Sequence, residues 1–195
     1  MFAFFAGLAA GLLHVFSGPD HLAAVAPLAA DGDRKHWKTG LQWGVGHTAG
    51  VLLIAALLLL LREQLPLDLI SAFSERIVGV ALIAVGCWGM WKASRATIKP
   101  HSHAGASFAM GTVHGLAGSS HLFGVLPALA FPARSDAVLY LAGFGVGAIA
   151  GMSAFAAGMG LLAIRFGGQQ RRYSGLLYAS SAAALVVGGF WLVGR

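Results

Sequence analysis

The stretch "HVFSGPDHLAAV" (His14–Val25) places two histidines, an aspartate and a Gly-Pro step inside an apolar run that begins at Phe2. Ionisable side chains are costly in apolar segments of this length, and they usually mark the path of an ion or a proton. The stretch therefore has to be explained together with the apolar segment that carries it.

The composition indicates the class of protein. Hydrophobic residues fill 57% of the 195 positions and charged residues only 10%, and apolar runs near the ~20 residues of a spanning helix recur along the chain. We predict an all-α, polytopic membrane protein with six transmembrane helices. Residues 1–195 form a single membrane domain in this interpretation, because six spans leave almost no chain for a soluble one. The runs are Phe2–Ala30, Thr39–Leu61, Ile77–Trp91, Ala106–Phe131, Ala137–Ile164 and Ser174–Val193.

Basic residues gather in alternate loops. Nine of the thirteen Lys and Arg residues lie in the loops after the first, third and fifth runs, and such a bias marks the cytoplasmic side. We therefore predict a multi-pass protein of a bacterial-type inner (plasma) membrane with both termini outside. The net charge of +6 is then a topology signal, and we expect no nucleic-acid partner. The single cysteine, Cys87, excludes an internal disulfide.

The chain resembles itself at an offset of about 100 residues. We predict two three-helix repeats, over about 1–95 and 105–195, and the odd number of spans inverts the second repeat in the membrane. Many transporters have this plan, with the substrate site near the midplane on interrupted helices. The aligned segments are Gly11–Ala30 with Gly111–Ala130 and Trp43–Gly50 with Phe144–Gly151.

The Gly18-Pro19 step predicts an interruption of the first span. Proline removes a backbone donor and clashes with the preceding turn, while glycine tolerates the dihedral angles of a break. Pro19 would begin the second half-helix and place Asp20 in its first turn, where the positive end of a helix stabilises a carboxylate. Ser119 or Ser120 offers an N-cap for an equivalent restart in the second repeat.

Helix rise, about 1.5 Å per residue, separates the intramembrane histidines into two layers. Residues seven apart on a straight helix stand about 10 Å apart, too far to bind one ion together. Unwinding at Gly18 would merge the layers, and the sequence leaves both arrangements open. The inner layer would hold Asp20, His21, His47 and His114, and the outer layer His14 and His121.

Imidazole and carboxylate ligands indicate the kind of ion. They suit Ni(II), Co(II), Zn(II), Fe(II) or Mn(II), and the lack of a thiolate cluster argues against Cu(I). His101 and His103 lie in a predicted cytoplasmic loop and are interpreted as solvated. Trp43 is interpreted as a packing residue or interfacial anchor rather than part of a ligand cage. The predicted metal ligands are His14, Asp20, His21, His47, His114 and His121.

These motifs resemble those of the nickel/cobalt transporter family. "HVFSGPDHLAAV" is similar to the family's His, spacer, Asp-His signature, and "WGVGHTAG" (Trp43–Gly50) to its Gly-His-Ser/Thr motif. "MGTVHGLAGSSHLFGVLPAL" (Met110–Leu129) resembles more closely the short, six-span urease-accessory (UreH-type) and sulfite-exporter-like relatives. The resemblance covers mainly the first, second and fourth runs. It implies metal recognition by His14, Asp20, His21 and His47.

The chain departs from the family in two places. The spacer between His14 and Asp20 has five residues, where the signature has four. The acidic motif of the later spans is replaced here by histidines and serines. These departures leave the identity of the metal and the direction of transport open. The replacing residues are His114, Ser119, Ser120 and His121.

We expect a transporter and not an enzyme. The expected cargo is a divalent transition-metal ion, with Ni(II) or Co(II) favoured and Zn(II), Fe(II) or Mn(II) as alternatives, and its binding would bias rocking of one three-helix repeat against the other. The expected partners are this ion and the lipid bilayer, and a homo-oligomer is compatible with the sequence. Two rivals stay open: a membrane haem-binding or electron-transfer protein with paired axial histidines, and an intramembrane hydrolase built on Ser119 or Ser120 beside His121.

Overall fold

Helices form all the regular structure in the described part of the chain. The computed structural model describes residues 1–31, 35–61, 67–95, 104–116, 125, 127–128, 130–167 and 170–193. The prediction of an all-α protein is confirmed for these residues. The labelled helices are α1 (Phe2–Ser17), α2 (Pro19–Asp31), α3 (Trp37–Leu61), α4 (Leu67–Ser94), α5 (Ala104–Leu116), α7 (Arg134–Gly167) and α8 (Gln170–Val193).

The described helices lie on the predicted apolar runs, with different bounds. Of the fourth run, Ala106–Phe131, the structure describes α5 and a few residues beyond it. The first run is split between α1 and α2. The third predicted run, Ile77–Trp91, lies within the apolar stretch Arg76–Ser94 of α4, but the helix itself starts earlier, at Leu67. Hydropathy detects only the apolar part of a helix. The first turns of α4 contain the polar residues Asp68, Ser74 and Glu75, so their mean hydropathy is too low for them to be recognised as part of the span.

Three helical stretches among the described residues are long and apolar enough to cross a bilayer. The bent pair α1–α2 adds a fourth if it forms one broken span. The chain is therefore described as a membrane protein with three to four spanning helices, and the full set of six stays a prediction. The three stretches are Arg76–Ser94, Arg134–Phe166 and Tyr173–Val193.

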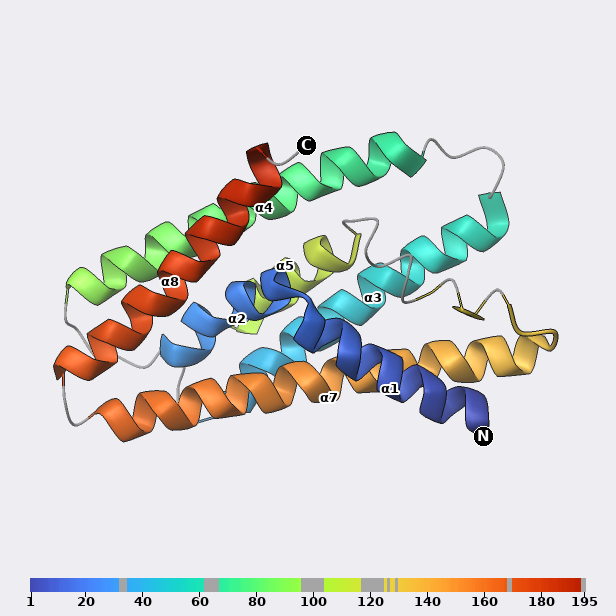
Figure 1. The fold of residues 1–195 in the computed structure, drawn as a ribbon, viewed down its shortest axis with the longest axis horizontal. Helices are drawn as coiled ribbons and strands as arrows, with labels where there is room; N and C mark the ends of the chain where they lie inside the picture. Colours follow the sequence, from blue (N-terminus) through green and yellow to red (C-terminus); the bar gives the residue numbers. More distant parts are fainter. Residues whose placement is uncertain are drawn as a thin grey trace.

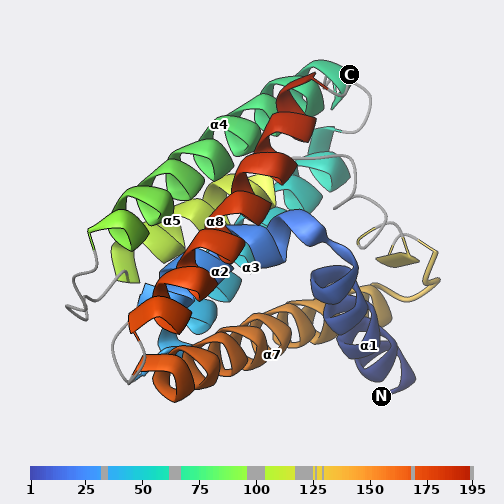
Figure 2. The same cartoon turned by 60° about the vertical axis from the view of Figure 1, so that its left-hand side comes forward.

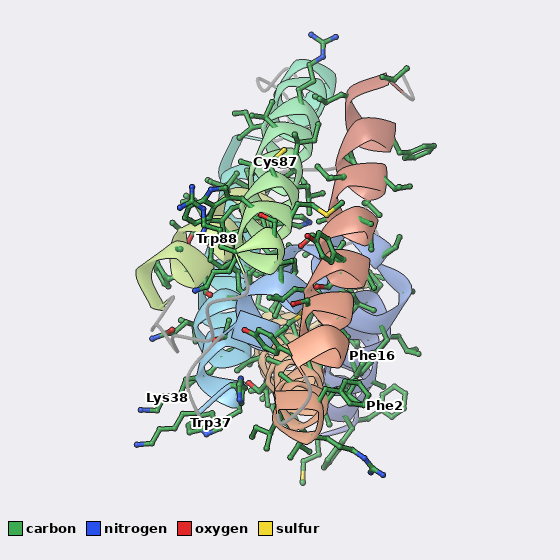
Figure 3. The ribbon with its side chains drawn as sticks, turned by 90° about the vertical axis from the view of Figure 1, so that its left-hand side faces the viewer. Phe2, Phe16, Trp37, Lys38, Cys87 and Trp88 are labelled. Atoms are coloured by element: carbon green, nitrogen blue, oxygen red, sulfur yellow. The ribbon has the colours of Figure 1, made fainter. Side chains whose placement is uncertain are left out.

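Large apolar side chains cover the outside of the helices. Phe190 and Val186 on α8 are 71% and 72% exposed, and Figure 3 shows Phe2, Phe16 and Trp37 projecting away from the helices. The centre instead holds many small residues, such as Ala148 of α7. A soluble protein rarely exposes so much apolar surface, whereas lipid chains cover such a surface in a bilayer.

The helices pack as a row of four and a separate pair. In the row, α1 packs on α7, α7 on α3, and α3 on α5. The helices α4 and α8 lie side by side and run in opposite directions (Figures 1 and 2). The short helix α2 packs against both members of the pair and against α7, so it connects the pair to the row.

Glycines allow two helix pairs to approach backbone to backbone. A Cβ on Gly11 of α1 would overlap the carbonyl oxygen of Phe144 in α7, and a Cβ on Gly111 of α5 would overlap that of Trp43 in α3. Gly11 and Gly111 are 100 residues apart, and Trp43 and Phe144 are 101 apart. The α1–α7 and α3–α5 contacts therefore correspond residue by residue. Inverted repeats would produce this correspondence, and the repeat organisation itself stays a prediction.

Candidate metal centre

The interruption predicted at Gly18-Pro19 is confirmed. The helix α1 ends at Ser17, α2 begins at Pro19, and the two are bent by 73°. Gly18 has an extended backbone (φ −94°, ψ 97°), and its carbonyl accepts a hydrogen bond from the backbone N–H of His21 at 3.1 Å. A Cβ at position 18 would overlap the His21 imidazole. Glycine is therefore needed here for the close approach and not for its dihedral angles.

The bend brings His14 against His21. Their ring centroids lie 4.6 Å apart in an edge-to-face arrangement, and His14 also stacks on His47 of α3 with centroids 5.5 Å apart. Of the two arrangements that the sequence left open, the structure shows the merged one for His14. The 73° bend removes the ~10 Å that a straight helix puts between residues seven apart. His14 instead joins the cluster predicted as the inner layer.

Asp20 joins two helices of the cluster. Its carboxylate is buried in the first turn of α2, where the positive end of the helix stabilises negative charge. Oδ1 lies 3.0 Å from Nδ1 of His21, and Oδ2 lies 3.0 Å from Nε2 of His114 on α5. A carboxylate can only accept hydrogen bonds, so both imidazole nitrogens donate to it.

Two sets of three candidate ligands share His21. His14, His21 and His47 form one set, and Asp20, His21 and His114 form the other, with the ligand atoms of each set within 4.8 Å of one another. Ligands on opposite sides of a first-row metal ion are about 4.2 Å apart, so small side-chain rotations would bring either set onto one ion. The structure thus places five of the six predicted ligands in one mostly buried cluster.

The sixth predicted ligand, His121, lies outside the described residues. The same holds for Ser119 and Ser120, the serines of the hydrolase alternative, and for the loop histidines His101 and His103. Cys87 is exposed on α4 (Figure 3).

Trp43 is the site residue whose role the sequence did not indicate. It is fully buried in α3, which agrees with its interpretation as a packing residue, and its ring stacks on His47 with centroids 4.8 Å apart. Its centroid also lies 5.3 Å from that of His21 and 5.4 Å from that of His114. The spacing of Trp43 and His47 could have indicated this contact. Residues four apart share one face of a helix, and Trp43 precedes His47 by four.

A cavity of about 740 Å³ reaches the cluster from one side. Its polar end is formed at the helix break by His14, Asp20 and His21. Most of the remaining lining residues are apolar, and α8 contributes more of them than any other helix. An ion that enters this cavity would thus meet the cluster at its end. The other described lining residues are Ala10, Ser17, Gly18, Pro19, Pro127, Tyr140, Val186, Val187, Phe190 and Trp191.

Comparison with known proteins finds relatives in plants and bacteria. The chain is 37% identical over 166 residues to Chloroplast protein FOR GROWTH AND FERTILITY 2 of Arabidopsis thaliana, covering 76% of this chain and 44% of the relative. It is 35% identical over 177 residues to Chloroplast protein FOR GROWTH AND FERTILITY 1 of the same plant, covering 79% of this chain and 48% of the relative. The chain therefore spans about half the length of these two relatives.

A third relative bears directly on the predicted resemblance. The chain is similar to Urease accessory protein UreH of Bacillus sp. (strain TB-90), with 26% identity over 175 residues that cover 80% of this chain and 75% of the relative. No protein family model and no solved structure matches the chain. The likeness to a urease-accessory protein is thus present at low identity. The nickel/cobalt assignment and the bacterial inner membrane stay predictions, since two relatives are chloroplast proteins.

Proposed function

We propose that this protein moves a divalent transition-metal ion across a membrane, with Ni(II) or Co(II) as the favoured cargo. One observation carries the proposal: two sets of ligands that share His21 meet at a helix break, buried among apolar helices and at the end of a cavity. Ionisable groups in such surroundings usually lie on an ion path. The similarity to a urease accessory protein supports a role connected with a metal.

We assign ion binding to His14, His21 and His47, and an orienting role to Asp20. His21 and His114 each donate one ring N–H to the Asp20 carboxylate. We propose that the ion binds Nε2 of His21, so that the hydrogen bond from Nδ1 to Asp20 stays intact. Carboxylates commonly hold metal-binding imidazoles in this way, which fixes the tautomer and makes the second nitrogen a better ligand.

The cavity is the proposed access route from the outer side. Tyr140 lies near the start of α7 and Trp191 near the end of α8, and the charge bias of the loops predicts both ends to be outside. Among the described residues, Val25 of α2 and Met152 of α7 belong to a packed apolar core beside the cluster, and we propose that this core blocks passage to the inner side in this state. We propose that this arrangement is an outward-facing state of an alternating-access cycle.

The glycine contacts change the expected motion. Rocking of residues 1–95 against 105–195 would separate α1 from α7 and α3 from α5, where the backbones touch at Gly11 and Gly111. We propose instead that the α4–α8 pair moves against the row of four helices. The cavity lies between α8 and the break of α1–α2, so this motion would open and close it.

Uptake into proteoliposomes tests the proposed function. The purified protein should accumulate Ni(II) or Co(II), and His21→Ala should abolish uptake because it removes the ligand common to both sets. His36→Ala is the matched control, since His36 is also buried but donates from Nδ1 to the Ala29 carbonyl at 2.7 Å, and it should transport normally. Equal transport by wild type and His21→Ala, with both inserted, would contradict the proposal.

The haem alternative fits the cluster less well. A haem iron clamped by two histidines has the porphyrin between their rings, but the rings of His14, His21, His47 and His114 contact one another, with neighbouring centroids 4.6–5.5 Å apart. A porphyrin would have to separate these rings. Purified protein with a Soret band would nevertheless favour haem over a metal-ion cargo.

A further inference from the structure

Three imidazoles of the cluster pack against one indole. Trp43 stacks almost parallel on His47, with an angle of 13° between the planes. It meets His21 edge to face at 67° and His114 at 53°. These histidines come from α2, α3 and α5, so a single side chain contacts imidazoles from three helices.

Phe144 occupies the corresponding position in the second half of the chain. Its ring centroid lies 5.3 Å from that of His14. Close glycine contacts hold both aromatic backbones, because Gly11 packs on the carbonyl of Phe144 and Gly111 on that of Trp43. These contacts fix the backbone of both aromatic residues beside the cluster.

We propose that Trp43 is a positioning residue that sets the metal preference of the cluster by fixing the ring planes of two proposed ligands, His21 and His47, and of the neighbouring His114. This inference rests on the proposed metal cargo. An imidazole binds a metal through a lone pair in the plane of its ring, so a ring that cannot turn offers its nitrogen in one direction. Metal ions differ in the geometry they accept: Zn(II) favours a tetrahedron, whereas Ni(II) takes square-planar sites. Imidazoles held in fixed orientations therefore favour the ion whose coordination geometry they match. Imidazoles that turn freely could adapt to either ion.

Replacing the indole with an aliphatic side chain tests this role. Trp43→Leu should change the ratio of the Ni(II) and Zn(II) dissociation constants by about tenfold, within the range that supporting residues of metal sites show. It should also shift the visible absorption bands of bound Co(II), which report coordination geometry. Tyr173→Leu is the control, because Tyr173 is a buried aromatic in a different core cluster, and it should leave both readouts unchanged.

The outcomes separate a positioning role from a structural one. A Trp43→Leu protein that binds both metals equally weakly, with the wild-type ratio and Co(II) spectrum, would overturn the proposal. If Trp43→Leu does not fold, Trp43→Phe provides the second test: Co(II) should quench tryptophan fluorescence in the wild type more than in this variant. Equal quenching would place the indole away from the ion and overturn the proposal. Failure of the proposed function looks different, since the wild type itself would then bind none of these metals.

Discussion

Asp20 and His114 lie 94 residues apart in the chain, yet Oδ2 of the carboxylate is 3.0 Å from Nε2 of the imidazole. This contact ties the first turn of α2 to the end of α5, and the second carboxylate oxygen ties in His21. Asp20 thus holds histidines from both halves of the chain in fixed orientations.

The assigned roles predict a graded series of metal affinities. Asp20→Asn should weaken binding about 10–100-fold, the usual effect of losing a group that orients a ligand, because the amide cannot accept from both imidazoles at once. His14→Ala should weaken it more, since it removes a proposed ligand. Fluorescent-indicator competition would measure each constant. If His14→Ala binds normally while His114→Ala does not bind, the second set holds the ion instead.

Gly18→Ala should damage the site and spare the fold. The added Cβ would overlap the His21 imidazole and lie 3.0 Å from Oδ1 of Asp20, so both groups must move. We expect metal affinity to fall about tenfold or more, with normal insertion and a monodisperse profile on size exclusion. Gly158→Ala is the control, because a Cβ there meets nothing within 4 Å. Unchanged affinity in Gly18→Ala would show that the close approach has no bearing on binding.

Gly11→Leu and Gly111→Leu should lower the Tm by similar amounts. Each places a side chain against a helix backbone at corresponding contacts, and overpacking of this kind costs about 1–3 kcal/mol or more. Gly175→Leu should have little effect, because a Cβ at Gly175 meets nothing within 4 Å. Thermal unfolding in detergent measures all three. A large loss at one site and none at the other would contradict the correspondence between the two helix pairs.

A cysteine at Ser17, in a Cys87→Ser background, tests the cavity and its side. Ser17 lines the cavity, so Ser17→Cys should react with a membrane-impermeant maleimide added outside cells. Lys38→Cys, on an exposed side chain at the predicted cytoplasmic end of α3 (Figure 3), should react only after permeabilisation. The reverse pattern would invert the predicted topology, and an unreactive Ser17→Cys would show that water does not reach the cavity.

Local rules predicted the helix break, while the site needed the tertiary structure. A Gly-Pro step disfavours a continuous helix, so the end of α1 and the start of α2 could be predicted from the sequence. The meeting of His14 with His21 was not, because it depends on the angle of a bend that no sequence pattern specifies. The role of Trp43 was missed for a related reason: an aromatic residue in an apolar run is usually ordinary packing, and only the positions of α2 and α5 show what it packs against.

Calorimetric titration of the purified protein with Ni(II), Co(II), Zn(II), Mn(II) and Fe(II) tests the central claim most directly. The account predicts saturable binding of one ion per chain, tightest for Ni(II) or Co(II), lost in His21→Ala and retained in His36→Ala. Absence of binding by the wild type, or binding that His21→Ala leaves intact, would contradict it.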